Sequence, residues 1–301
     1  AELLSMKNHP VAMGLSLFSI VALQTFALVL STLHLGKPQY FYRAMNNLRH
    51  SWVSREIATM GGFYGFLAAY SVVTVFPGTA AWLPEGISAL LPSFLGTAAS
   101  VFAPLALYCM YRCYRIPARP FWDHWHSGGA FFSSAFILGS SAIGLIFGTS
   151  GLSANGTIAV PLQVFALVLL AGLFIQGTAL YAHGRYLTRR GEEAAISRML
   201  MLEKHGLTHR ARWLTWCALM IGGILFTLSP ASAGPVGVVI WALMFATAVL
   251  HEVIGRALFY VLVTPTTVPR GFFWGNHSFE TMARKSGLAA RPQVGVLMDG
   301  H

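Results

Sequence analysis

The chain has 301 residues, of which 55% are hydrophobic and 10% are charged, with a mean hydropathy of +0.60 and a net charge of +10. Soluble domains carry about 25% charged residues, so this composition argues against a soluble enzyme, a disordered chain or a nucleic-acid-binding protein, whose basic residues would spread over a water-facing surface. The three cysteines, Cys109, Cys113 and Cys217, form no pattern typical of a disulfide framework, a zinc site or an iron–sulfur cluster.

Seven runs of mostly apolar residues approach the length of about 20 residues that a helix needs to cross the hydrocarbon of a bilayer. The first run is too long for a secretory signal peptide, and no small-residue cleavage site follows it. The sequence therefore predicts an all-α fold, a polytopic bundle of transmembrane helices. Its spans are expected near Val11–Leu33, Ile57–Phe76, Ile87–Tyr111, Gly128–Phe147, Ile158–Tyr181, Trp213–Leu228 and Pro235–Val263.

The basic residues lie almost entirely in the connections after the first, third and fifth spans and in the tail after the last span. In such a topology these segments share one side of the membrane, called the charged face below. Short cytoplasmic loops accumulate Lys and Arg, so we expect the charged face and the C-terminus in the cytoplasm. A docked acidic partner would select the same basic loops on either side of the membrane, and this alternative stays open.

Two segments outside the spans have distinct patterns. The stretch GEEAAISRMLMLEKHG has acidic residues at its start and apolar residues at helical spacing, which predicts a helix on the membrane surface near residues 191–205. The last segment begins with prolines and aromatic residues and becomes polar. We therefore divide the chain into a transmembrane bundle, residues 1–264, and a docking tail, residues 265–301.

Few ionisable residues lie at membrane depth, where each costs about 2.5 kcal/mol or more and is a functional candidate. His34 closes the first span and Glu56 opens the second, so both are expected at the charged face as neighbours. Each also has a structural interpretation: His34 as a cap at the interface, and Glu56 as a first-turn carboxylate favoured by the helix dipole. Glu252 and Arg256 are four residues apart in the last span, a spacing that favours a structural ion pair.

A cluster of this kind fits quinone chemistry, because a quinol that gives up two electrons also gives up two protons. His34 has an unperturbed pKa of about 6.5, which suits a proton acceptor at neutral pH, and Glu56 is the second candidate station. Arg55 and His183 are expected at the same face and join the cluster. No series of carboxylates crosses the membrane, so we do not predict proton pumping.

The string HLGKPQYFYRAMNNLRHSWVSREI, between the first two spans, closely resembles the signature of the membrane anchor of dimethyl sulfoxide reductase and its relatives. That family includes membrane subunits of sulfite-oxidising molybdoenzymes. The stretches PFWDHWHSGGAFFSSAFILGSSAIG and HEVIGRALFY agree with it as well. The resemblance covers most of the chain, from about His34 to Tyr260. Members of the family usually have eight spans and carry the HLG motif at the end of the second, whereas here it ends the first.

The resemblance implies an anchor that passes electrons between menaquinone or ubiquinone and a ferredoxin-like iron–sulfur subunit. That subunit serves a catalytic subunit carrying molybdopterin, so iron–sulfur clusters and molybdenum are expected only in the partners, and no haem or other metal is expected here. It further implies the inner membrane of a prokaryote, and the composition and apolar runs imply contact with membrane lipid and none with nucleic acid. The family's quinol-site histidine and glutamate correspond to His34 and Glu56. The expected quinone-binding residues are His34, Gly36, Pro38, Arg55, Glu56 and His183.

Two other functions stay open at this point. A cytochrome b-like anchor would bind haem through His34, His183 and His251. A transporter would use Glu252 and Arg256 as its substrate site, although the paired repeats and broken spans typical of transporters are not evident.

Overall fold

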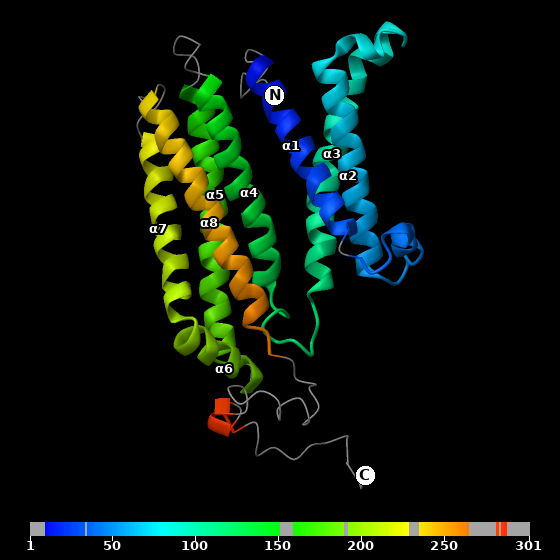
Figure 1. Ribbon diagram of the computed structural model, residues 1–301. Coiled ribbons are helices and arrows are strands. Elements are labelled where there is room, and N and C mark those ends of the chain that lie inside the picture. Colours follow the sequence, from blue (N-terminus) through cyan, green and yellow to red (C-terminus); the bar gives the residue numbers. More distant parts are fainter. Residues whose placement is uncertain are drawn as a thin grey trace.

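The structure is a computed structural model that describes residues 10–33, 35–150, 159–189, 192–228, 235–264, 281–282 and 284–287. Within these residues, seven long helices run side by side (Figure 1), and there is no strand. All seven are long and apolar enough to cross a membrane, which confirms the predicted transmembrane bundle. They are α1 (Pro10–Leu33), α2 (Trp52–Val75), α3 (Glu85–Cys113), α4 (Trp125–Ser150), α5 (Ala159–Leu187), α7 (Gly206–Leu228) and α8 (Pro235–Val261).

Short helical elements complete the described part of the chain. Two 3₁₀ helices, η2 (Pro38–Met45) and η3 (Pro77–Ala80), flank α2. The predicted surface segment contains a helix, α6 (Glu192–Met199), followed by a π-helical turn, η5 (Leu200–Lys204). The predicted docking tail lies outside the described residues, apart from residues 281–282 and 284–287.

Several long helices extend beyond the apolar runs that predict them. The N-terminus of α2 is capped by Ser51, whose hydroxyl accepts a hydrogen bond from the backbone N–H of Ser54 at 3.3 Å. Backbone hydrogen bonds within a helix do not require apolar side chains, so a helix can continue past the hydrocarbon into the polar interface. Glu56 therefore lies inside α2, and Arg212 lies inside α7 and not in a loop.

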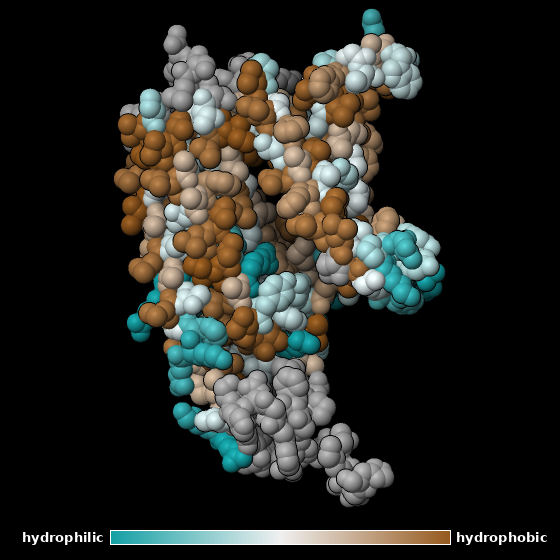
Figure 2. All heavy atoms as spheres, in the orientation of Figure 1, coloured by the Kyte–Doolittle hydropathy of each residue, from teal (hydrophilic) through white to brown (hydrophobic). Residues whose placement is uncertain are grey.

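The helices form two groups, which meet where α1 and α3 contact α4 (Figure 1). Helices α4, α5, α7 and α8 pack together around an apolar core that includes Phe147, Leu169 and Trp241. Helix α2 packs mainly on α3, and α1 contacts both α2 and α4. The connections α1–α2, α3–α4 and α5–α7 and the end of α8 lie at one end of the bundle, as the charge pattern predicts (Figure 1). Hydrophilic residues gather at that end, whereas hydrophobic residues cover the middle of the face shown in Figure 2.

A glycine on α4 allows the four-helix core to close around Trp241. A Cβ atom at Gly144 would overlap the fully buried Trp241 ring, whereas a Cβ at Gly139 on the same helix would meet nothing within 4 Å. We expect Gly144→Ala to destabilise the protein by about 1–3 kcal/mol through overpacking. Gly139→Ala is the matched control and should be neutral or slightly stabilising. Unfolding in detergent micelles measures both, and equal stabilities of the two variants would contradict this packing.

Candidate functional site

Glu56 lies near the start of α2 with its side chain half-buried against the end of α3. Its Oε2 atom accepts a hydrogen bond from the thiol of Cys113, the last residue of α3, at an Sγ–Oε2 distance of 3.2 Å. Among the described residues, the one ion pair joins Arg115 to Asp123 at 2.7 Å. Within that part of the chain, Glu56 therefore has a neutral partner and no cationic one, an unusual state for a carboxylate in an apolar bundle.

Arg55 precedes Glu56 but points to the loop before α2. Its Nε donates to the carbonyl oxygen of Leu48 at 2.8 Å, and its Nη2 donates to that of Arg49 at 2.6 Å. The guanidinium also lies 4.2 Å from the centre of the Trp52 ring. These contacts tie the loop to the first turn of α2, so Arg55 positions the segment that carries Glu56 and does not pair with it.

The structure describes two of the three other quinone-binding residues predicted near Glu56, namely Gly36 and Pro38. His34 lies outside the described residues. Gly36 lies in a bend where a Cβ would meet nothing within 4 Å, and Pro38 opens η2. Helix η2 contacts both α1 and α2, which places it beside the helix that carries Glu56. Its aromatic side chains are exposed, with Phe41 at 51% and Tyr42 at 48%.

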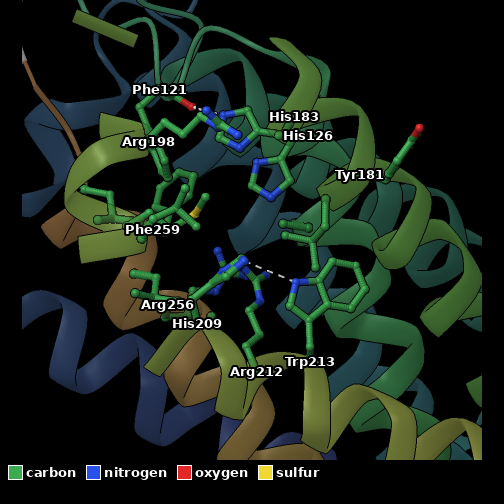
Figure 3. A pocket seen from close by; sticks show the side chains of 18 of the residues that line it. Phe121, His126, Tyr181, His183, Arg198, His209, Arg212, Trp213, Arg256 and Phe259 are labelled. Atoms are coloured by element: carbon green, nitrogen blue, oxygen red, sulfur yellow. Dashed lines mark hydrogen bonds between the residues drawn. The ribbon is translucent and has the colours of Figure 1, made fainter. Parts of the chain in front are cut away.

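His183, predicted to join Glu56, lies instead in a cavity within the other group of helices. The cavity has a volume of about 340 Å³ and opens between α4, α5, α7, α8 and η5. The Nε2 atom of His183 is hydrogen-bonded to the carbonyl oxygen of Phe121 at 3.0 Å, and its ring stacks on His126 with centroids 4.2 Å apart. Both rings line the cavity (Figure 3), and Glu56 does not. The structure thus divides the predicted cluster between two places.

An aromatic cluster connects these two places. Tyr114, next to Cys113, has its hydroxyl 3.0 Å from that of Tyr260 on α8. The Trp122 indole donates to the carbonyl oxygen of Phe259 at 2.8 Å and stacks on the Phe259 ring. Burial and the hydrogen bond to Tyr260 raise the pKa of Tyr114. The charge of Glu56 raises this pKa further, whereas the charge of Arg256 lowers it. Tyr114 therefore remains neutral between the two charged regions.

The predicted ion pair between Glu252 and Arg256 is not formed directly. Glu252 is buried, and its two oxygens accept hydrogen bonds from the Ser134 hydroxyl at 2.6 Å and from the Gln176 amide at 2.9 Å. Arg256 reaches the same hydroxyl at 3.4 Å and lies over the Phe131 ring. The predicted direct ion pair is therefore wrong, and the two charged side chains are linked through the Ser134 hydroxyl. The reason is that α4 and α5 supply nearer partners for the carboxylate than the next turn of α8 does.

His251 continues this network into the core. Its Nε2 is hydrogen-bonded to the Gln176 side-chain oxygen at 2.6 Å, and its Nδ1 lies 2.9 Å from the Thr215 hydroxyl. Both ring nitrogens therefore have partners within the bundle, which does not favour His251 as a haem ligand. Glu252 is similarly occupied, which does not favour a substrate site of a transporter at that residue.

Several polar residues of the cavity are missed by the sequence prediction. His126 lies in the first turn of α4, and Arg212 is counted in the sequence with a charged loop. Gln176, which lies inside the apolar span of α5 and bonds to the cavity residue Glu252, is missed as well. Polar side chains that recur in different spans at a similar depth are the signal that would find them, since bundle interiors collect such groups. Which of these groups face one another depends on the rotation of each helix, which the sequence pattern does not show.

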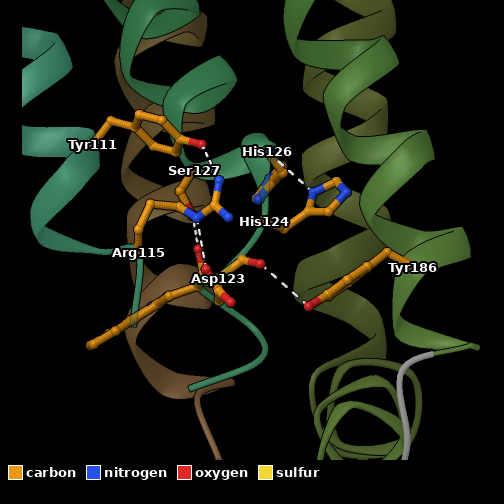
Figure 4. Close-up of polar contacts among 8 residues, drawn as sticks. Tyr111, Arg115, Asp123, His124, His126, Ser127 and Tyr186 are labelled. Atoms are coloured by element: carbon orange, nitrogen blue, oxygen red, sulfur yellow. Dashed lines mark hydrogen bonds and ion pairs between the residues drawn. The ribbon is translucent and has the colours of Figure 1, made fainter. Parts of the chain in front are cut away.

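His124, in the connection between α3 and α4, is a pH-sensitive contact outside the spans (Figure 4). Its Nδ1 accepts a hydrogen bond from the backbone N–H of His126 at 3.1 Å. Burial, and then the charge of Arg115, lower the pKa of His124, against the smaller opposing effect of Asp123. The unfolded chain then binds a proton more readily than the folded protein, so stability is full above about pH 6.5 and is lost as the pH falls toward the folded pKa.

We therefore expect His124→Asn, which keeps a hydrogen-bond acceptor, to reduce the loss of stability between neutral pH and about pH 5. Thermal unfolding in micelles across this range measures the effect. The matched control is His50→Asn, the same replacement at an exposed histidine away from this contact. An unchanged slope in His124→Asn would show that other groups cause the acid sensitivity.

Comparison with known proteins places this architecture in a family. Neither the curated proteins nor the solved structures contain a match to the chain. The family model described as DMSO reductase anchor subunit (DmsC) matches residues 8–262, a stretch that contains all seven long helices, Glu56 and the cavity. This match confirms the resemblance carried by the HLG and SRE motifs, and the chain therefore belongs to the family of DMSO reductase anchor subunits.

Proposed function

We propose that this chain, a membrane anchor subunit of a DMSO-reductase-type complex, exchanges electrons between the membrane quinone pool and an iron–sulfur subunit. The exchange takes place at the charged face, beside the start of α2. The molybdopterin reaction takes place in a separate catalytic subunit, so this chain contributes the quinone chemistry and the attachment to the membrane.

The half-buried carboxylate of Glu56 carries this proposal. A quinol that delivers two electrons must also release two protons, and the reverse reaction must take them up. Glu56 has a thiol as its partner and no cation among the described residues, so its carboxylate can take a proton without breaking an ion pair. His34 is proposed as the second proton-exchanging group, on the basis of its position in the HLG motif.

The exposed segment beside Glu56 fits a protein partner. Helix η2 and the loop after it present exposed aromatic rings together with basic residues, and Arg43 lies over the Tyr40 ring. Aromatic and arginine side chains are enriched at protein interfaces. We propose that an iron–sulfur subunit with an acidic docking surface binds here, which brings its cluster near the quinone.

The basic loops support an orientation for the assembly. Under the loop-charge rule, the charged face and the soluble subunits lie in the cytoplasm, with the bundle in the inner membrane of a prokaryote. This arrangement suits a cytoplasmic, sulfite-oxidising type better than a reductase exported from the cytoplasm.

Reduction of the iron–sulfur clusters tests the function. The complex with its soluble subunits is reconstituted in lipid vesicles and mixed with menaquinol or with ubiquinol, and the paramagnetic signals of reduced clusters are followed. We expect reduction with at least one quinol, and none when the same soluble subunits are mixed with vesicles that lack this chain. Equal reduction in both samples would exclude this chain from the electron route.

A further inference from the structure

The cavity between α4, α5, α7, α8 and η5 has an excess of positive charge. Among the described residues of its lining, arginines reach it from several elements, whereas Glu252 is the one acidic side chain. Both oxygens of Glu252 already accept hydrogen bonds from Ser134 and Gln176. Among the described residues, no ion pair joins this carboxylate to an arginine. The arginines that line the cavity are Arg185, Arg198, Arg212 and Arg256.

Arg212 is the most deeply placed of these cations. Its side chain is 7% exposed, and its buried Nε has no hydrogen-bond partner among the described residues. The guanidinium extends from α7 into the cavity (Figure 3) and lies close to Gly255 of α8, where a Cβ would be 3.1 Å from Nη2. A buried arginine with an unsatisfied donor is costly in an apolar bundle unless an anion binds it.

His126 faces the cavity from the other side and also has polar atoms without hydrogen-bond partners among the described residues. It is 3% exposed, and neither of its ring nitrogens has a hydrogen-bond partner among the described residues. In Figure 3 the rings of His126 and His183 lie across the opening from Arg212 and Arg256. Donors thus converge on one space from α4, α7 and α8, which is the arrangement of a built anion site.

We propose that this cavity binds the phosphate group of an anionic phospholipid from the leaflet at the charged face. A phosphate offers several acceptor oxygens and a negative charge, and it would satisfy Arg212 and His126 while neutralising the excess of arginine. Basic pockets between transmembrane helices are suited to anionic headgroups. A quinone carries no charge and would leave the excess unbalanced.

The outer surface beside the cavity supports a lipid over a free phosphate ion. Tyr181 lies at the opening and points away from the cavity (Figure 3), with its side chain 65% exposed. Phe174 and Leu167 continue the same face of α5 at intervals of seven residues and are 67% and 56% exposed. This apolar stripe leads from the opening toward the middle of the membrane and can hold acyl chains.

Lipid binding by the full chain in a nonionic detergent tests the proposal. The chain is first stripped of lipid, and native mass spectrometry and thermal unfolding then follow the addition of phosphatidylglycerol, phosphatidylcholine or inorganic phosphate. We expect phosphatidylglycerol to bind and to raise the unfolding temperature, with little effect of the other two. An equal shift with inorganic phosphate alone would overturn the lipid assignment, and an equal shift with phosphatidylcholine would overturn the anion site.

Substitutions of the cavity arginines test where phosphatidylglycerol binds. Arg212→Gln should weaken phosphatidylglycerol binding by about 10-fold or more. Arg119→Gln, a basic residue of the same face outside the cavity lining, should leave it unchanged. If Arg212→Gln does not fold, the exposed Arg198 at the opening provides a second test, since Arg198→Gln should also weaken binding. Unchanged binding in Arg198→Gln and in any folded Arg212→Gln, or displacement of the lipid by a soluble quinone analogue, would overturn the proposal.

Discussion

Replacing Glu56 by glutamine is expected to lower quinol-dependent turnover of the assembled complex by about 100-fold or more, because positioned proton transfer contributes about 10²–10⁴ to such rates. The amide has nearly the shape of the carboxylate and can still accept the hydrogen bond from Cys113, so the fold around α2 and α3 should persist. What is lost is the capacity to take or release a proton. Turnover with a quinol and turnover with a reduced dye, which donates electrons directly to the soluble subunits, are measured in parallel.

Two controls separate this role from a structural one. Dye-driven turnover should remain at the wild-type level in Glu56→Gln, which shows that the partners are bound and intact. Cys113→Ser retains a donor to Glu56 and should reduce quinol turnover only a few-fold. Wild-type quinol kinetics in Glu56→Gln would remove this residue from the site, whatever the behaviour of His34.

Gln176→Leu is expected to destabilise the protein by about 2–4 kcal/mol. The Gln176 side chain donates to Glu252 and is hydrogen-bonded to His251, and all three residues are buried. A leucine at this position is of similar size but leaves two polar groups without their partner in an apolar core. The cost is that of two unsatisfied groups and not of the hydrogen bonds alone.

The free energy of unfolding in mixed micelles measures this effect. Thr178→Val, on the same helix, is the matched control, because Thr178 is exposed and its hydroxyl bonds only to carbonyl groups of its own helix. We expect the control to change stability by less than about 0.5 kcal/mol. A loss in Gln176→Leu no larger than that of the control would show that the network adds little to stability.

The sequence predicts the candidate site only in part, and its wrong groupings of residues have a common cause. The sequence predicts one cluster that contains Glu56 and His183, because both lie near the charged ends of their spans. The position of a residue along a span shows its depth in the membrane, but not the direction in which the side chain points around the helix axis. Glu56 faces Cys113 of α3, whereas His183 faces His126 and the cavity.

The pair Glu252 and Arg256 shows the same limit. Their spacing correctly places both on one face of α8, toward α4. The partners that replace the direct ion pair, Ser134 and Gln176, come from two other helices and are distant in the sequence. Only the packing of α4 and α5 against α8 brings them within hydrogen-bond distance.

The sequence by itself determined the fold class, the seven spans found in the described residues and the end of the bundle that carries the charge. Through the HLG and SRE motifs it also determined the family. These properties depend on local composition, since a helix crosses the membrane where its residues are apolar over the required length and basic residues accumulate in the loops. The tertiary structure alone decided the cavity and the separation of Glu56 from His183. It also decided that the Arg212 Nε and the His126 ring have no hydrogen-bond partner among the described residues. Those features depend on the rotation and contacts of whole helices, which are set by interactions between residues far apart in the chain.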